Sequence, residues 1–326
     1  MKQLKYFLLL MFLSVGVLGT TYANNLQLDT DPPNEFITLA EFLQGRTDFL
    51  NGEFPIVPAD EVKKNLKNEA YHIIDIRNEG WFDYGHIKDA ANVKAADLLN
   101  YFETQISPAD YEKIVLVCYS GQSAAYFAGL LRIAGYDNVY SMKWGMSSWR
   151  EDFADPWINN TQPSFEDQLE TAMNAMPEAS EHPQLATGKA SGEEILKARL
   201  QELFEVPYSE FILKSEAVFE TPQEYFTLYF GQPESYTNGH IPGSVLYEAN
   251  SLRANTSLMT LPTDKKVALY TTTGQEAAYV LAYLNVLGYD AGNIAYGENG
   301  FKNKSLKKAG SDAFTTKEIN MFPVIE

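Results

Sequence analysis

The sequence predicts an α/β protein with two similar domains, each a mainly parallel sheet flanked by helices. Three observations support this fold class. Short apolar segments alternate with helical segments, the second half of the chain repeats the first, and 326 residues suffice for two cores. Strands and helices that alternate along a chain favour a parallel sheet with helices on both of its faces.

The first half of the chain contains a regular succession of predicted helices and strands. Apolar residues at helical spacing predict helices over residues 58–68, 97–105 and 123–134. Short β-rich or apolar runs predict strands over residues 71–76, 114–117 and 139–142. Gly135 is expected to end the third helix, because glycine readily adopts the left-handed conformation found at helix ends.

A long internal repeat relates the two halves of the chain. Residues 114–137 align with residues 267–290 at a constant separation of 153 positions. The aligned pairs are Gly121 with Gly274, Gln122 with Gln275, Tyr126 with Tyr279 and Gly135 with Gly288, and His86 upstream aligns with His240. A series of matches in the same order over about 100 residues indicates one structural unit present twice.

The repeat and the composition divide the chain into four predicted parts. They are a signal peptide at 1–23, a first domain at 30–155 that carries Cys118, an acidic linker at 156–193 and a degenerate second domain at 194–326. The linker is polar and rich in proline, serine and alanine, and we expect it to be partly helical around residues 164–176.

The first residues have the features of a signal peptide. Lys2 and Lys5 precede an apolar stretch at 6–18, and Thr21-Tyr22-Ala23 resembles a cleavage site. An uncleaved membrane anchor is the alternative, but the stretch is shorter than the ~20 residues that span a bilayer. The mature protein is therefore expected to be exported, either periplasmic or secreted, and not to be held at a membrane.

The composition excludes several classes of partner. The formal net charge is −18 and no basic cluster stands out, so nucleic acids and anionic membranes are not expected partners. The four histidines are scattered without metal-ligand spacing, and neither a metal nor another cofactor is predicted. A single cysteine leaves no internal disulfide, so stability must come from burial.

Cys118, the only cysteine, follows the apolar run at 114–117 and precedes a short polar loop and a helix. Gly121 lets this loop curl so that its N–H groups point at the sulfur. Those groups and the positive end of the helix would stabilise a thiolate, so we expect a thiol pKa below the ordinary value of about 8.5. A buried structural cysteine is the alternative interpretation.

Three motifs around these elements resemble those of the rhodanese family. They are Asp75-Ile76-Arg77 with residues 81–87 and 90–93, the loop at 118–124, and Lys143-Trp144-Gly145 through Trp149. The motifs occur in the family's order and at suitable spacing, and the repeat extends the resemblance to nearly the whole mature chain. The protein is thus similar to tandem rhodaneses, with two rhodanese-like domains.

The resemblance implies a sulfurtransferase of the thiosulfate sulfurtransferase type. Cys118 would attack the sulfane sulfur of thiosulfate or a similar small anion, sulfite would leave, and the persulfide would pass its outer sulfur to cyanide or a thiol. The residues implied to line the substrate site are Tyr119, Ser120, Gly121, Gln122, Ser123, Ala124 and Arg77, with Asp75 and His86 in support.

Several of these implied roles have two interpretations. Ser120, Gln122 and Ser123 either contact the oxygens of the sulfur donor or only shape the loop. Asp75 and Arg77 are expected to form an ion pair that stiffens the neighbourhood of the loop, and the guanidinium would also favour an anionic substrate.

The second domain departs from the motifs at three positions. Thr271 stands in place of Cys118, and Tyr229 and Gly231 stand in place of the aspartate and arginine of the first domain. The second domain is therefore predicted to be inactive and to serve packing. Deletion of residues 190–326 is expected to lower stability and to leave a competent thiol. In tandem rhodaneses the reactive cysteine usually lies in the C-terminal domain, whereas here it lies in the N-terminal one.

Two other functions remain open. One is a persulfide carrier that delivers sulfur to a partner protein, and the other is a non-catalytic binding or scaffold protein. A phosphatase or arsenate reductase of related fold is disfavoured, because Ala124 stands where such enzymes place an arginine that clamps the phosphoryl group.

Overall fold

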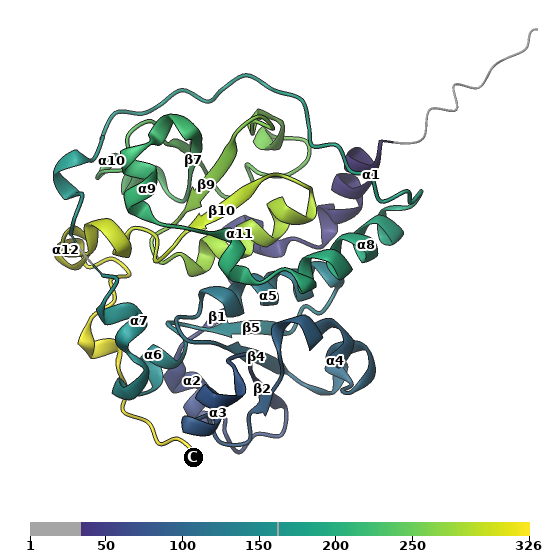
Figure 1. The fold of residues 1–326 in the computed structure, drawn as a ribbon, viewed down its shortest axis with the longest axis vertical. Helices are drawn as coiled ribbons and strands as arrows, with labels where there is room; N and C mark the ends of the chain where they lie inside the picture. The colour runs from purple at the N-terminus through teal and green to yellow at the C-terminus, as the bar shows by residue number, and fades with distance from the viewer. Residues whose placement is uncertain (1–33, 162) are drawn as a thin grey trace, which may run out of the picture. The chain divides into compact units, whose positions relative to one another are not determined.

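The computed structural model of the protein describes residues 34–161 and 163–326, so the predicted signal peptide lies outside the described residues (Figure 1). The described chain forms two five-stranded sheets in which every strand pair is parallel. The first has the order β1-β5-β4-β2-β3, with β1 at Ile56–Val57, β2 at Tyr71–Asp75, β3 at Ala91–Asn92, β4 at Lys113–Val117 and β5 at Val139–Met142. The second has the order β6-β10-β9-β7-β8, with β6 at Ile212–Leu213, β7 at Tyr225–Phe230, β8 at Val245–Tyr247, β9 at Lys266–Tyr270 and β10 at Ala291–Ile294. The two orders are equivalent, which confirms the predicted α/β class and shows that the repeat is one of topology.

Helices connect the strands in both halves. Those of the first half are α1 at Glu35–Phe42, α2 at Ala59–Lys64, α3 at Glu79–Tyr84, α4 at Leu98–Thr104, α5 at Gln122–Ala134, α6 at Met146–Trp149 and α7 at Asp155–Ile158. Those of the second half are α8 at Gly192–Glu205, α9 at Ser215–Glu220, α10 at Pro233–Thr237, α11 at Gln275–Val286 and α12 at Asn299–Ala309. The predicted helices and strands of the first half are all present. Gly135 ends α5 with a φ of 111°, as predicted.

The predicted helix around residues 164–176 is wrong. The structure has only a short 3-10 turn there, at Glu166–Gln168. The segment instead bonds to the second half of the chain: Asn174 donates to the carbonyl of Ser244, and the Ser180 hydroxyl donates to the carbonyl of Leu261. These long-range partners replace the internal bonds of a helix. Regular structure resumes at α8, which begins with a capping box at Ser191.

Both faces of the first sheet are covered, as expected for parallel strands. Along β4, Ile114 and Leu116 join the core cluster that contains α5, whereas Val115 and Val117 join a second cluster with Val62 of α2. Side chains of a strand point alternately to its two faces, so each face has its own apolar layer. Cys118, which follows the run, belongs to the layer that contains α5.

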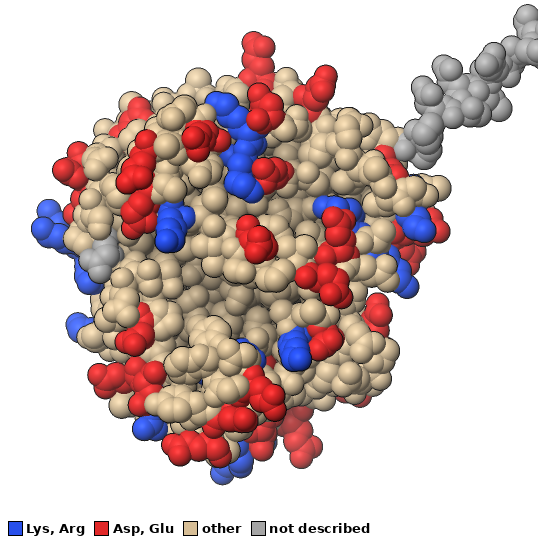
Figure 2. Space-filling model, viewed as in Figure 1, with Lys and Arg blue, Asp and Glu red and all other residues tan. Residues whose placement is uncertain are grey.

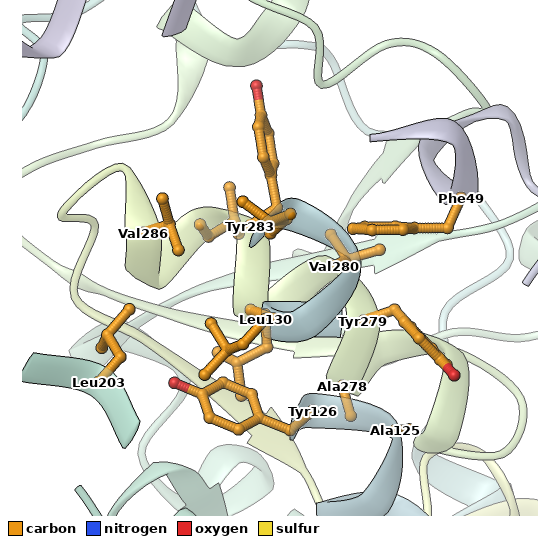
Figure 3. Packing of buried hydrophobic residues seen from close by; sticks show 14 of the residues in the cluster. Phe49, Ala125, Tyr126, Leu130, Leu203, Ala278, Tyr279, Val280, Tyr283 and Val286 are labelled. Carbon is orange, nitrogen blue, oxygen red and sulfur yellow. The ribbon is translucent and has the colours of Figure 1, made fainter. Parts of the chain in front are cut away.

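Helices α5 and α11 lie side by side and join the two halves (Figure 1). Their apolar side chains belong to one continuous cluster (Figure 3). The cluster contains Tyr126 of α5 and Tyr279 of α11, which are aligned in the internal repeat. The Tyr279 hydroxyl donates to the carbonyl of Pro55 at 2.8 Å, and Asn285 donates to the Tyr126 hydroxyl at 3.4 Å. Both hydrogen bonds join the two halves. The interface therefore satisfies its buried polar groups as well as burying apolar side chains.

Each half also pairs with a backbone segment from outside it. The segment that follows the first half in the chain pairs with the second half, and the segment at the end of the second half pairs with the first. The backbone of Glu170, in the linker, pairs with His240 of the second half, and both N–H···O distances are 2.9 Å. The backbone of Ile325 pairs with His86 of the first half at the same distances. The exchange is reciprocal, so the first half is completed by residues at the far end of the described chain.

The chain has a formal net charge of −18. On the face drawn in Figure 2, acidic side chains are spread widely and basic ones lie among them. No helix within the described ranges is long and apolar enough to cross a membrane.

Candidate active site

Cys118 lies where β4 ends and the loop to α5 begins. The backbone N–H groups of Gly121 and Ala124 point at its sulfur, with N···Sγ distances of 3.1 and 3.4 Å. The predicted orientation of the loop amides toward the sulfur is therefore confirmed for these two groups. The side chain is buried, with 2% of the residue exposed. The geometry suits a sulfur that carries negative charge during a reaction.

Gly121 is required at its position for two reasons. Its φ of 85° lies in the left-handed region, which side chains disfavour. A Cβ atom there would also lie 2.2 Å from Nε2 of Gln275 and 2.9 Å from the carbonyl oxygen of Met142. The loop is therefore held in shape by its own backbone and by the second half of the molecule.

A second turn, at Gly145 and Met146, packs against the loop and binds its carbonyl groups. The N–H of Met146 donates to the carbonyl of Cys118 at 2.9 Å, and the indole of Trp157 donates to the carbonyl of Ser120 at 2.9 Å. Gly145 lies against the loop so closely that a Cβ atom would approach the Cys118 oxygen to 2.5 Å. Sequence reasoning included Gly145 in a motif but did not identify this support. The recurrence of the glycine as Gly297 was the signal that a backbone contact is kept in both halves.

Burial raises the pKa of the Cys118 thiol. Hydrogen bonds from the Ser123 hydroxyl and from the amides of Ala124 and Gly121 act in the opposite direction, and burial outweighs them. The sequence-based expectation of a lowered pKa is therefore wrong for this closed site. That argument included the local donors but not the burial of the thiol, which lies in a core cluster that also contains residues of the second half.

We expect alkylation of Cys118 by iodoacetamide to show a pH midpoint above about 8.5, the value of a free thiol. The thiolate is the reactive form, so the rate rises as pH passes through the raised pKa. Measurement of the rate against pH on folded protein checks this, with the denatured chain as the control, where the midpoint falls back to about 8.5. A folded-state midpoint below that of the denatured chain would contradict the dominance of burial.

Asp75 and Arg77 form the predicted ion pair beside the loop. The guanidinium donates to both carboxylate oxygens, through Nε at 3.0 and 3.1 Å and through Nη2 at 2.7 Å. Nη2 also donates to the carbonyl of Gly85 at 2.7 Å. Asn92 holds the backbone of the pair by donating to the carbonyls of Asp75 and Arg77 at 2.9 Å. The predicted ion pair is therefore present, and its stiffening of the loop stays a prediction.

The guanidinium of Arg77 is enclosed by aromatic rings. Its central carbon lies 5.0 Å from the ring centroid of Phe153 and 5.9 Å from that of Tyr119. Its Nη1 is buried without a hydrogen-bond partner among the described residues. Direct contact between Arg77 and a sulfur donor stays a prediction, and the side chain as placed has no exposed surface.

Gln122 and Gln275 exchange contacts across the interface between the halves. Oε1 of Gln122 accepts from the N–H of Tyr296 at 2.8 Å, and Oε1 of Gln275 accepts from the N–H of Trp144 at 2.7 Å. Each glutamine thus binds the turn that supports the loop of the other half. This contact explains why glutamine is kept in the half that lacks the thiol, and a substrate role for Gln122 stays a prediction.

The remaining predicted site residues occupy different surroundings. Ser120 accepts a hydrogen bond from Nε2 of Gln122 at 3.2 Å, Ala124 is fully buried and Tyr119 is half-buried at the surface of the loop. His86 stacks on Phe82 with 3.8 Å between the ring centroids, and its Nδ1 lies 2.9 Å from the Phe82 carbonyl oxygen.

His240 has the same two contacts with Tyr236 in the second half. The structure therefore supports a structural role for His86, because its surroundings recur where the thiol is absent.

The second half has different side chains at the equivalent site. The N–H of Ala277 donates to Oγ1 of Thr271 at 3.3 Å, which reproduces the loop geometry without a thiol. The ring of Tyr229 fills the space beside Gly231, where a Cβ atom would come within 2.8 Å of it. Burial raises the pKa of Glu276 to about 7, with Asp312 adding to the shift. The surroundings of Thr271 lack the arginine and the thiol that define the first site.

Comparisons with known proteins agree with this description. The family described as the rhodanese-like domain matches residues 58–152 and 230–304, which together exceed half of the chain. The thiosulfate sulfurtransferase GlpE of Shewanella oneidensis is 32% identical over 99 residues, covering 30% of this chain and 94% of the relative.

Two further similarities are more distant. The tRNA uridine(34) hydroxylase of onion yellows phytoplasma is 27% identical over 110 residues, covering 33% of this chain and 36% of the relative. A crystal structure of a thiosulfate sulfurtransferase from Pseudomonas aeruginosa aligns with 91% of this chain and 49% of its own, at 16% identity and a TM-score of 0.29. The double family match and the two equivalent sheets show that the chain belongs to the rhodanese family, which supports sulfur transfer in general.

Proposed function

We propose that the protein is an exported sulfurtransferase that moves a sulfane sulfur from thiosulfate or a similar donor to cyanide or a thiol through a persulfide on Cys118. The observation that carries the proposal is the loop of the first half, where two backbone N–H groups point at the only thiol in the chain. Export rests on the signal-peptide features of residues 1–23.

The first step is an attack of the Cys118 thiolate on the sulfane sulfur of the donor. The bond between the sulfane sulfur and the sulfonate breaks, and sulfite leaves with the electron pair. The loop amides of Gly121 and Ala124 face the reacting sulfur and stabilise negative charge on it. Because burial raises the pKa of the thiol, this step becomes faster as pH rises.

The second step regenerates the thiolate. The acceptor attacks the outer sulfur of the persulfide, the bond between the two sulfurs breaks, and Cys118 leaves as a thiolate. The same amides that stabilise the persulfide also stabilise this leaving group. The Asp75–Arg77 pair holds the strand end next to the loop and keeps the geometry constant between the steps.

Intact mass measurement tests the proposal. We expect incubation of the mature protein with thiosulfate to add the mass of one sulfur atom, and subsequent cyanide to remove it as thiocyanate. Protein whose Cys118 has first been alkylated at high pH serves as the control and should gain nothing. If the protein gains no sulfur from thiosulfate, polysulfide or an organic persulfide, this result excludes the sulfurtransferase function and leaves a binding function.

A further inference from the structure

A shallow pocket lies next to the candidate active site. It has a volume of about 410 Å³ and is lined by Asn78, Gly80, Trp81, Tyr84 and Asp152. A neighbouring pocket of about 310 Å³ shares Tyr84 and Asp152 with it. Volumes of this size suit a small molecule.

Aromatic rings connect this pocket to the reactive loop. Trp81 meets Tyr84 and Tyr119 edge to face, with ring centroids 5.7 and 5.9 Å apart. Tyr119 directly follows Cys118 in the loop. Trp81 is 42% exposed and Tyr84 is 57% exposed, so two large aromatic side chains face solvent, and Trp81 contacts the residue that follows the thiol. Trp81 therefore links a ligand in this pocket to Tyr119 of the loop by direct ring contact.

The charge around the two pockets is mainly negative. Their charged lining residues are Asp83, Asp152, Glu326 and Arg150. Arg150 pairs with Asp152 at 2.5 Å. Arg77 lies behind the rings of Tyr119 and Phe153, and its charge is matched by the bidentate contact with Asp75. Asp83 and Glu326 line the neighbouring pocket and form no ion pair among the described residues. A cation is attracted by these two carboxylates and by the negative faces of the aromatic rings, whereas an anion is repelled by both.

We propose that this pocket binds the sulfur acceptor and that the acceptor is a small organic thiol that carries a positive charge. The inference rests on the proposed function, and it narrows the acceptor from any thiol to a cationic one. The cationic group lies against Trp81, Tyr84 and Asp152, and its thiol reaches past Tyr119 to the persulfide.

The transfer balances without any further reactant. The acceptor thiolate forms a bond to the outer sulfur of the Cys118 persulfide, and the bond between the two persulfide sulfurs breaks. Cys118 keeps that electron pair and leaves as a thiolate. The outer sulfur, which came from the donor without a proton, takes up the proton that the acceptor thiol gave up, and the acceptor becomes a persulfide.

The test compares three thiols of similar size and different charge: cysteamine, 2-mercaptoethanol and 3-mercaptopropionate. Protein loaded with the persulfide is mixed with each thiol, and loss of the added sulfur is followed by mass spectrometry. Each rate is divided by the rate of the same thiol with a neutral disulfide in solution, and by the rate of the same protein with cyanide. We expect cysteamine to exceed 2-mercaptoethanol by about 3- to 10-fold, and 3-mercaptopropionate to be slowest.

Variants of the pocket assign this preference to named residues. Trp81→Leu and Asp152→Asn should bring the ratio of cysteamine to 2-mercaptoethanol close to one, whereas Arg150→Gln should increase it. Asp60→Asn is the matched control, because Asp60 is an exposed carboxylate that also pairs with a basic neighbour, Lys64. The control should keep the preference of the unaltered protein.

Two results would overturn the inference: equal normalised rates for the three thiols, or a preference that survives both Trp81→Leu and Asp152→Asn. Binding of choline, followed by ligand-observed NMR, examines the pocket without any sulfur transfer. Choline binding that disappears in both variants supports the cation site, and absence of binding to the unaltered protein contradicts it. Failure to form a persulfide at all would overturn the proposed function. The choline measurement would still show whether the pocket binds a cation.

Discussion

Replacement Cys118→Ser should lower turnover with thiosulfate and cyanide by at least about a thousandfold, because the covalent step loses its nucleophile. The chain has no other cysteine that could take over. A serine hydroxyl fits the loop and accepts from the same N–H groups, but it does not ionise at accessible pH and does not form a persulfide. A steady-state assay of thiocyanate formation measures the loss.

The matched control for this variant is Thr271→Ser in the equivalent loop of the second half. There the N–H of Ala277 contacts the hydroxyl just as the N–H of Ala124 contacts the sulfur of Cys118. Thr271→Ser should keep turnover, and both variants should keep the melting temperature within a few degrees. Substantial turnover in Cys118→Ser would mean that the persulfide mechanism is wrong.

Deletion of residues 190–326 should leave a first half that does not remain folded and soluble. In α5, 11 of 13 residues are buried, so the helix has no face suited to water. Without the second half, the apolar side that contacts α11 and α8 becomes exposed. The free energy of burial lost at this apolar side is comparable to the free energy of unfolding of an ordinary domain, which is roughly 5–15 kcal/mol. Circular dichroism and light scattering on the truncated protein check this expectation.

The structure also changes what we expect of the thiol in that truncated protein. The sequence suggested that Cys118 would stay competent, yet the deletion removes Gln275, which binds the Trp144 N–H next to the supporting turn. It also removes the Ile325 backbone that pairs with His86, next to the Gly85 carbonyl that accepts from Arg77. We therefore expect sulfur transfer to be lost together with the fold.

Co-expression of the two halves as separate chains, divided within the linker near residue 180, provides the control. All contacts of the interface are then available in trans, and a stable, active complex should form. A truncated first half that is folded and active by itself would show that the second half is dispensable.

Much of the site could be predicted because its signals are local. The apolar run before Cys118, the glycine at 121 and the helical pattern after it specify a strand, a tight loop and a helix within about twenty residues. The backbone of the loop then directs the amides of Gly121 and Ala124 at the sulfur. The equivalent topology of the two sheets followed from the repeat, because similar patterns of apolar residues produce similar strand orders.

Only the tertiary structure decided the properties that depend on distant parts of the chain. The pKa of Cys118 is raised because surrounding side chains exclude water from it, and no local pattern specifies that enclosure. Gln122 and Gln275 look like loop residues in the sequence, but they meet the opposite half because α5 and α11 pack together. The linker lost its predicted helix to partners some 70 to 80 positions away, at Ser244 and Leu261. The sequence determined the conformation of each loop, whereas packing between the halves determined its solvation and support, since both arise from contacts that form only when the chain has folded.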